Sequence, residues 1–271
     1  FKVSGVTDTN EFETVNIESA GATKNTIAGL QDTGGNATAS TKTVNISGAG
    51  ALDITLSGGA ATAAADASAA TGAVKMIWGG NFTSLTGGSG ADTFDVSAGS
   101  FLGSTAPKAI VGGSGTDTIV FAENVQALTS NTAITPHSVT GVEALEIEGK
   151  LANGGSADLT RTVEADLIAG ISSIAIDASN LDTGAAGSGG EDVTITVNDI
   201  ESQSVDIKFV ATATNTNDEF VNLNMKDDTG SADVMNISIS NPAATSVTGI
   251  TTLTIGRAAA AANNLVETVN L

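Results

Sequence analysis

Two copies of one nonapeptide constrain the fold of this chain more than any other feature of its sequence. Residues 87–95 read GGSGADTFD, and residues 112–120 read GGSGTDTIV. Both match G-G-x-G-x-D-x-U-x, in which U is a large apolar residue, and this pattern is typical of calcium-binding turns in parallel β-helices. One copy arises easily in a chain with 32 glycines, but two full copies, each followed by a β-prone run, are a strong signal.

Each residue type in the nonapeptide has a physical role in such a turn. Calcium takes about six to eight oxygen ligands, so several oxygens must converge on one point. Glycines reach backbone conformations closed to other residues, which lets their carbonyl groups converge, and the aspartate at the sixth position adds a charged oxygen. The apolar residue two places later, Phe94 or Ile119, is expected to begin a strand and to point inward. The predicted calcium ligands are Gly87, Ser89, Gly90, Asp92, Asp95, Gly112, Ser114, Gly115 and Asp117.

The two copies lie 25 residues apart, whereas a tandem β-roll repeats with every nonapeptide. Their similarity begins before the glycines, because Leu85 in the first copy matches Ile110 in the second. We therefore expect strand, calcium turn and strand in each copy, with a longer excursion over residues 96–108. If the copies stack as successive coils, Asp92 and Asp117 come close and share one ion. The alternative is a pair of glycine-rich β-turns without metal.

A second repeat runs through the whole chain. Residues 12–21 (FETVNIESAG) resemble residues 41–50 (TKTVNISGAG), and residues 138–147 (SVTGVEALEI) resemble residues 246–255 (SVTGITTLTI). Apolar and polar residues alternate in each copy, which indicates strands with one buried face. Repeats at a spacing of about 25–30 residues are typical of solenoids. We therefore expect an all-β fold, a parallel β-solenoid or β-roll-like stack with Gly/Asp-rich calcium-binding turns, and the alternative is an antiparallel β-sandwich.

The composition divides the chain into three expected regions. Residues 1–75 are a β-rich repeat region with an Ala-rich insertion at 57–73, which we expect to form a short helix or a surface loop. Residues 76–150 hold the calcium-binding β-roll, and residues 151–271 are a second β-rich repeat region. The chain begins without methionine and stops inside a repeat, so we expect a piece of a longer protein.

Charge and composition narrow the possible partners. The chain has 30 acidic and 10 basic residues, so its formal charge is −20, which argues against nucleic acid and anionic membranes as partners. Cations are the natural counterpart, because self-repulsion at this charge destabilises a compact state until something neutralises it. The absence of cysteine excludes disulfides. No apolar run approaches the length of a membrane span.

The sequence argues against an enzyme. The single histidine, His137, follows Pro136 in a polar turn, where we expect an exposed loop residue rather than a catalytic base. The metalloprotease motif H-E-x-x-H is absent. Trp78 is expected in the core. Three further acidic turns, near Asp192, Asp218 and Asp233, are candidate calcium sites by analogy only.

The nonapeptides resemble those of the RTX proteins, which bacteria export by type I secretion, although the full motif covers only 18 of 271 residues. With its strands of the V-x-G-V-E-x-L-x-I type, the chain most resembles a calcium-dependent bacterial surface-layer (S-layer) protein. The resemblance implies a self-assembling lattice on the outside of the cell, with Ca2+ needed for folding and for contacts between subunits. The implied partners are copies of the same chain, calcium, and cell-surface polysaccharide bound through parts outside this chain.

Two other classes within the same resemblance stay open. One is an RTX adhesin or filament segment, which an exposed apolar or aromatic patch would favour. The other is the non-catalytic calcium β-roll of a secreted hydrolase. Flat, repeated edges that meet identical neighbours would favour the lattice.

Overall fold

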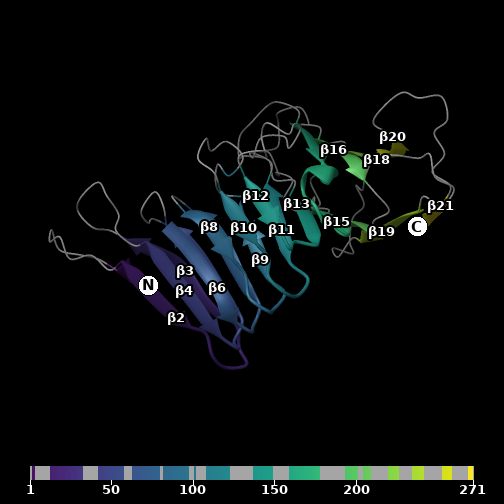
Figure 1. Ribbon diagram of the computed structural model, residues 1–271. Coiled ribbons are helices and arrows are strands. Elements are labelled where there is room, and N and C mark those ends of the chain that lie inside the picture. The colour runs from purple at the N-terminus through teal and green to yellow at the C-terminus, as the bar shows by residue number, and fades with distance from the viewer. Residues whose placement is uncertain are drawn as a thin grey trace, which may run out of the picture. The chain divides into compact units, whose positions relative to one another are not determined.

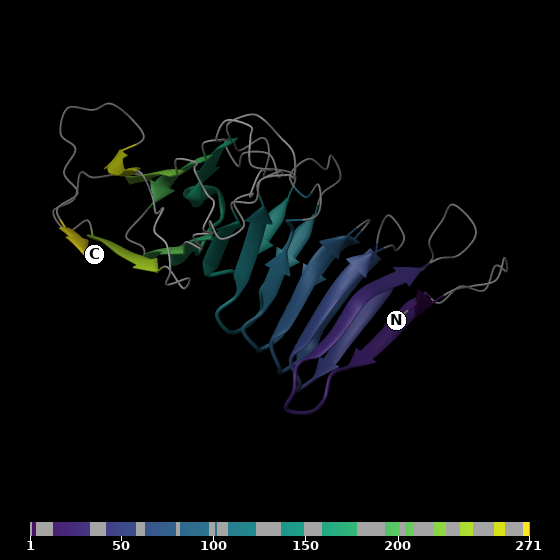
Figure 2. The same cartoon turned by 180° about the vertical axis from the view of Figure 1, so that it is seen from behind.

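The protein is nearly all β, and its computed structural model is a parallel β-solenoid (Figures 1 and 2). The structure describes residues 2–3, 13–32, 42–57, 63–79, 82–97, 101, 108–122, 137–148, 159–177, 193–200, 204–208, 219–225, 234–240, 252–257 and 268–270. The chain divides into two compact units: unit 1 is Phe1–Phe121 with Ile134–Ala144, and unit 2 is Ala122–Ala133 with Leu145–Leu271. Among the described residues, no helix is long and apolar enough to span a membrane.

Unit 1 is built from two parallel sheets, and the chain places one strand in each sheet per coil. The first sheet holds, in order, β1 (Lys2–Val3), β3 (Asn25–Asp32), β5 (Leu52–Ser57), β7 (Val74–Gly79), β9 (Thr93–Asp95) and β11 (Thr118–Ala122). The second holds β2 (Thr14–Glu18), β4 (Thr43–Gly48), β6 (Ala63–Ala70), β8 (Phe82–Thr86), β10 (Ala109–Val111) and β12 (Ser138–Thr140). Each strand pairs with the strand two places along the chain, as the purple-to-teal arrows of Figure 1 show.

The core of unit 1 consists of columns of apolar side chains that stack from coil to coil. Ile54 lies beside Met76, Met76 beside Phe94, and Phe94 beside Ile119, and all four side chains are fully buried. Buried and half-buried residues alternate along β5 and β7, because successive side chains of a strand point to opposite faces and only one face meets the core. Burial of each large side chain contributes about 1.5–3 kcal/mol. The prediction that Phe94 and Ile119 point inward from strands is confirmed.

The Ala-rich stretch differs from its prediction. Residues 63–70 form strand β6, between β4 and β8, rather than a helix or a loop. Ala63, Ala65 and Ala67 are fully buried, so alternate residues of this strand face the core with small side chains. The high helix propensity of alanine is overridden here, because β4 and β8 pair with β6 on both sides, each with one register shift.

The internal repeats at residues 12–21 and 41–50 stack directly on one another. Val15 pairs with Val44, and Asn16 pairs with Asn45, so the two TVNI sequences lie in register on β2 and β4. The Asn45 side-chain amide donates a hydrogen bond of 2.8 Å to Asn16 Oδ1, 29 residues away. Repeats that coincide with whole coils confirm the stacked parallel arrangement over the antiparallel sandwich.

Unit 2 repeats the same two-sheet plan. One sheet holds β13 (Ala144–Glu148), β15 (Ser173–Asp177), β17 (Ser204–Lys208), β19 (Val234–Ser240) and β21 (Thr268–Asn270), and the other holds β14 (Leu159–Glu164), β16 (Val193–Ile200), β18 (Glu219–Met225) and β20 (Thr252–Arg257). A 3-10 turn, Ala165–Leu167, follows β14. Ile195 pairs with Val221, and Val221 with Leu253, so apolar side chains again stack from coil to coil. The acidic turns near Asp192, Asp218 and Asp233 lie outside the described residues.

Candidate calcium site

The two nonapeptides stack in register at one corner of unit 1. Strand β10 pairs with β8 on one side of the turn, and β11 pairs with β9 on the other. The backbone N–H of Asp92 donates a hydrogen bond of 2.7 Å to Asp117 Oδ1. The prediction that stacking brings Asp92 and Asp117 together is therefore confirmed.

The glycines of this corner are required by the close approach of successive coils. A Cβ atom on Gly87 would overlap the carbonyl oxygen of Gly112, and one on Gly90 would lie 2.6 Å from the backbone of Gly72. A Cβ on Gly115 would overlap the carbonyl oxygen of Gly90 in the same way. The stacking alone therefore explains why these positions are glycine, with or without a bound ion.

A third carboxylate continues the stack. Glu143 Oε2 accepts a hydrogen bond of 2.9 Å from the backbone N–H of Asp117, as Asp117 does from Asp92. Gly141 lies beside Gly112, because β12 pairs with β10 up to Thr140 and the Gly112 N–H donates to the Thr140 carbonyl. Sequence analysis missed Glu143, because it follows its glycine by two residues instead of five; the signal was a glycine, then an acid, then a strand.

In the first copy, the carboxylate of Asp92 is satisfied by the backbone. Its Oδ1 accepts a hydrogen bond of 2.7 Å from the Val74 N–H, and its Oδ2 accepts one of 2.6 Å from the Gly88 N–H. The side chain is almost completely buried. Burial raises the pKa of Asp92, and the hydrogen bonds from Gly88 and Val74 oppose that shift.

In the second copy, the carboxylate of Asp117 is only half satisfied. Its Oδ1 accepts the Asp92 N–H, but its Oδ2 is buried and has no hydrogen-bond partner. Burial raises the pKa of Asp117 to about 6, and although the hydrogen bond from Asp92 opposes the shift, the negative charges of Asp92 and Glu143 add to it. A buried carboxylate oxygen without a partner is costly, so the site favours a proton or a cation.

The two identical GGSG sequences adopt different backbone conformations. Gly113 and Gly115 have φ values of 107° and 126°, whereas Gly88 and Gly90 stay outside this left-handed region. The Gly88 N–H donates to the carboxylate of its own turn, while Asp117 Oδ2 receives no such bond. The two turns therefore differ both in backbone conformation and in the hydrogen bonding of their carboxylates.

Two oxygens flank Gly112, as Asp92 Oδ2 and the Gly112 carbonyl flank Gly87 in the first copy, but only in the second copy does the carboxylate oxygen lack a hydrogen bond. A Cβ on Gly112 would lie 2.6 Å from Asp117 Oδ2 and would overlap the carbonyl oxygen of Gly141, so both oxygens flank the same glycine. Carboxylate and carbonyl oxygens are the ligands that calcium prefers. Within the described part of the chain, no group of three or more acidic or histidine side chains is placed to hold a metal. A calcium ion here would draw its remaining ligands from backbone carbonyls and water.

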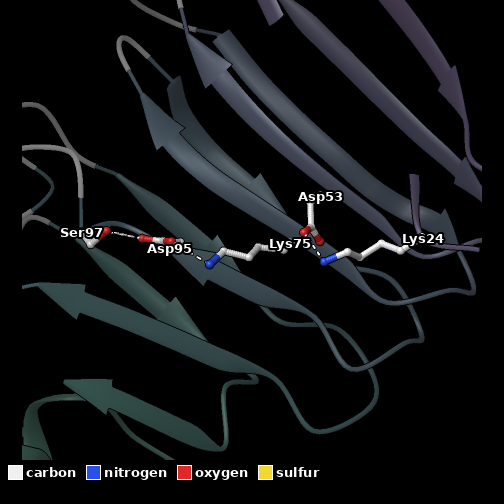
Figure 3. A network of polar contacts seen from close by, with 5 residues as sticks. All are labelled: Lys24, Asp53, Lys75, Asp95 and Ser97. Atoms are coloured by element: carbon white, nitrogen blue, oxygen red, sulfur yellow. Dashed lines mark hydrogen bonds and ion pairs between the residues drawn. The ribbon is translucent and has the colours of Figure 1, made fainter. Parts of the chain in front are cut away.

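Asp95, the last residue of the first nonapeptide, lies away from this corner. Figure 3 shows its carboxylate between Lys75 and Ser97. The Lys75 Nζ lies 2.9 Å from Asp95 Oδ2, and the Ser97 backbone N–H donates to Oδ1. A second pair in the same view joins Lys24 to Asp53. The structure therefore gives Asp95 protein partners, and it does not bring its carboxylate to Asp92 and Asp117.

The remaining predicted ligands, Ser89 and Ser114, are exposed. The Ser114 N–H donates a hydrogen bond of 2.9 Å to the Gly88 carbonyl, and the Ser89 N–H donates one of 3.0 Å to the Ala70 carbonyl. Their backbone N–H groups therefore hold successive coils together.

A second buried polar cluster surrounds His137, whose prediction as an exposed loop residue is wrong. His137 is only 9% exposed, its ring lies 4.8 Å from that of Phe101, and neither ring nitrogen has a hydrogen-bond partner. Lys108 lies on the adjacent coil, where its Nζ donates to the Phe82 carbonyl and sits 5.0 Å from the Trp78 ring centroid. The prediction of Trp78 as a core residue is confirmed.

Comparisons with known protein families, with curated proteins and with solved structures find no match for this chain.

Proposed function

We propose that the chain is a calcium-dependent structural subunit of a self-assembling surface layer on the outside of bacterial cells. The observation that carries this proposal is the buried oxygen of Asp117, which has no hydrogen-bond partner and lies beside a second carboxylate. A chain with a charge of −20 that buries an unpaired carboxylate is stabilised by a bound cation. Calcium matches the oxygen ligands that this corner offers.

Calcium binding and folding are coupled in this proposal. The carbonyl of Gly141 and the carboxylate of Asp117 come together only when the coils stack, so the unfolded chain has no site. The free energy of binding then adds directly to the free energy of folding. The chain would stay unfolded where calcium is scarce and fold after export.

The outer surface favours a lattice of copies over adhesion to an apolar partner. Among the described residues, Val111 is the exposed large apolar side chain, at 40%. The outward positions of the strands hold polar residues such as Asn16 and Asn45. Contacts between such faces are polar, and cations bridge the acidic groups. The proposed partners are other copies of this chain and calcium.

The test is circular dichroism and size-exclusion chromatography of the full chain in millimolar calcium and in excess chelator. Magnesium at equal concentration and ionic strength is the control, because it demands a tighter octahedral geometry. We expect calcium alone to increase the β-signal and to produce large assemblies, which electron microscopy would show as sheets. A calcium-induced fold that stays monomeric would contradict the lattice, and the absence of any calcium response would contradict the whole proposal.

A further inference from the structure

The aspartates of the two nonapeptides differ in how many of their carboxylate oxygens accept a hydrogen bond. Both oxygens of Asp92 accept backbone N–H groups, from Val74 and Gly88, at 2.7 and 2.6 Å. Two short charge-assisted hydrogen bonds satisfy a buried carboxylate well. In the first copy, backbone N–H groups therefore satisfy both oxygens of the aspartate.

In the second copy, only one oxygen of the aspartate accepts a hydrogen bond. Asp117 Oδ1 accepts the Asp92 N–H, whereas Oδ2 is buried without a partner. Gly113 takes a φ of 107°, unlike Gly88, and no N–H of the second turn bonds Oδ2 as the Gly88 N–H bonds Asp92 Oδ2. One nonapeptide therefore has a free charged oxygen, and the other does not.

A residue outside both nonapeptides completes the second turn. Glu143 comes from the SVTGVEALEI repeat, and its Oε2 accepts the Asp117 N–H at 2.9 Å, which brings a second carboxylate to the same corner. The Gly141 carbonyl oxygen of that repeat flanks Gly112 together with Asp117 Oδ2. Two negative charges and a carbonyl oxygen thus come from two different repeat types.

We infer that calcium binds in unit 1 at one composite site, formed by Asp117 of the second nonapeptide with Glu143 and the Gly141 carbonyl of the following repeat, whereas the first nonapeptide is a metal-free structural turn. This inference rests on the proposed calcium dependence and deepens it. It assigns a ligand that the nonapeptide pattern does not contain. It also disfavours an ion shared between Asp92 and Asp117, because both Asp92 oxygens already accept a backbone hydrogen bond, whereas Asp117 Oδ2 accepts none.

Three isosteric variants of the full chain separate the roles. Asp117→Asn keeps an oxygen for the Asp92 N–H and removes the charge, while its new amide faces the Gly141 carbonyl as a donor. Glu143→Gln keeps an acceptor for the Asp117 N–H. Asp92→Asn sets an amide donor against the N–H of Val74 or Gly88, which weakens the first turn but leaves the backbone N–H that bonds Asp117 in place. Asp53→Asn removes one charge from the outer face, beside Lys24, and is the matched control.

The experiment counts bound calcium by equilibrium dialysis and measures the melting temperature of each variant in calcium and in chelator. We expect Asp117→Asn to bind one calcium ion fewer than the wild type. Glu143→Gln should lower the affinity for that ion by about 10–100-fold. Asp92→Asn and Asp53→Asn should keep the wild-type ion count. In chelator, Asp117→Asn should melt higher than the wild type and Asp92→Asn lower. Because ion counts are compared between variants, sites elsewhere in the chain do not affect the result.

The outcomes separate this inference from the proposed function. A wild-type chain that binds no calcium would contradict the proposed function itself. A wild-type chain that binds calcium, with an Asp92→Asn variant that folds and loses the ion, would overturn the composite site and leave calcium dependence standing. Retention of every ion by Asp117→Asn would overturn it equally. If Asp117→Asn does not fold, Glu143→Gln decides the result, because Glu143 is only half buried and its replacement keeps the hydrogen bond.

Discussion

The backbone N–H of Asp92 donates a hydrogen bond of 2.7 Å to the carboxylate of Asp117, which lies 25 residues later in the sequence. The same bond links Val74 to Asp92 one coil earlier and Asp117 to Glu143 one coil later. At this corner, each carboxylate therefore binds the preceding coil, and the motif aspartates hold the stack together. A ladder of this kind places like charges at the separation of neighbouring strands, about 4.8 Å, which the fold must neutralise.

The first prediction concerns pH in the absence of calcium. The pKa of Asp117 is raised from its usual 3.8 to about 6, so the folded state binds a proton more tightly than the unfolded state does. With chelator, stability should therefore increase as the pH falls from 7 to 4, by about 3 kcal/mol from this residue, since one pKa unit is worth about 1.36 kcal/mol. Urea unfolding at each pH measures this gain.

Two comparisons make the pH prediction specific. The gain from Asp117 should be missing in Asp117→Asn, so the difference between the two pH profiles isolates this residue. In millimolar calcium the dependence should reverse, because protons compete with the ion and acidification removes it. Parallel profiles for the wild type and the variant in chelator would show that Asp117 does not titrate in this range.

The second prediction tests the close approach of coils. Gly112→Ala would drive a Cβ into the carbonyl oxygen of Gly141, so we expect a loss of about 3 kcal/mol or more, or failure of unit 1 to fold. Gly29→Ala is the matched control, because the nearest atom to its Cβ is the Ser57 hydroxyl oxygen at 3.7 Å. Thermal unfolding followed by circular dichroism measures both variants. Equal effects would show that the backbone at Gly112 relaxes freely.

The stacking of the nonapeptides could be predicted from the sequence, whereas the difference between them could not. Leu85 and Ile110 precede identical GGSG sequences at a fixed distance, and repeats that cannot bury their apolar faces alone must stack. The conformations of Gly88 and Gly113 depend on what lies beneath each turn. Gly88 packs over the carbonyl oxygen of Ala70 at the end of β6, whereas Gly113 packs over the carbonyl oxygen of Gly88.

The position of Glu143 and the burial of His137 could not be predicted from the sequence either, because both depend on contacts between coils. The position of Glu143 depends on a corner with one residue between glycine and acid instead of four, so a fixed motif spacing does not detect it. The burial of His137 depends on Phe101, whose ring lies 4.8 Å from the imidazole although the two residues are far apart in the sequence. Periodicity predicts the strands, but contacts between the ends of different coils decide the chemistry of the corners.

The third prediction concerns the ion pairs on the outer face of the first sheet. Lys75→Met leaves the Asp95 carboxylate, with its side chain 9% exposed, without its cationic partner, so we expect a loss of about 1–2 kcal/mol. The Lys42–Glu13 pair has side chains that are 57% and 67% exposed, so Lys42→Met should cause no measurable change. Urea unfolding in saturating calcium compares the two. A similar loss in both variants would contradict the importance of burial at Asp95.

The last prediction concerns the buried imidazole of His137. Burial lowers the pKa of His137 from its usual 6.5, and the positive charge of Lys108 lowers it further. The unfolded chain therefore takes up a proton before the folded chain does, so stability from this residue is lost as the pH falls from about 7 through 6.5 and below. His137→Phe removes the titrating group and the unpartnered ring nitrogens while it keeps the ring contact with Phe101.

We expect His137→Phe to match or exceed the wild-type stability at pH 7 and to exceed it clearly at pH 5. The double variant with Asp117→Asn separates the two titrations, because Asp117 and His137 shift stability in opposite directions on acidification. Chemical unfolding in chelator between pH 5 and 8 is the measurement. If the difference between His137→Phe and the wild type did not depend on pH, the imidazole would be satisfied by a partner such as an ordered water, and its burial would carry no penalty for the proton.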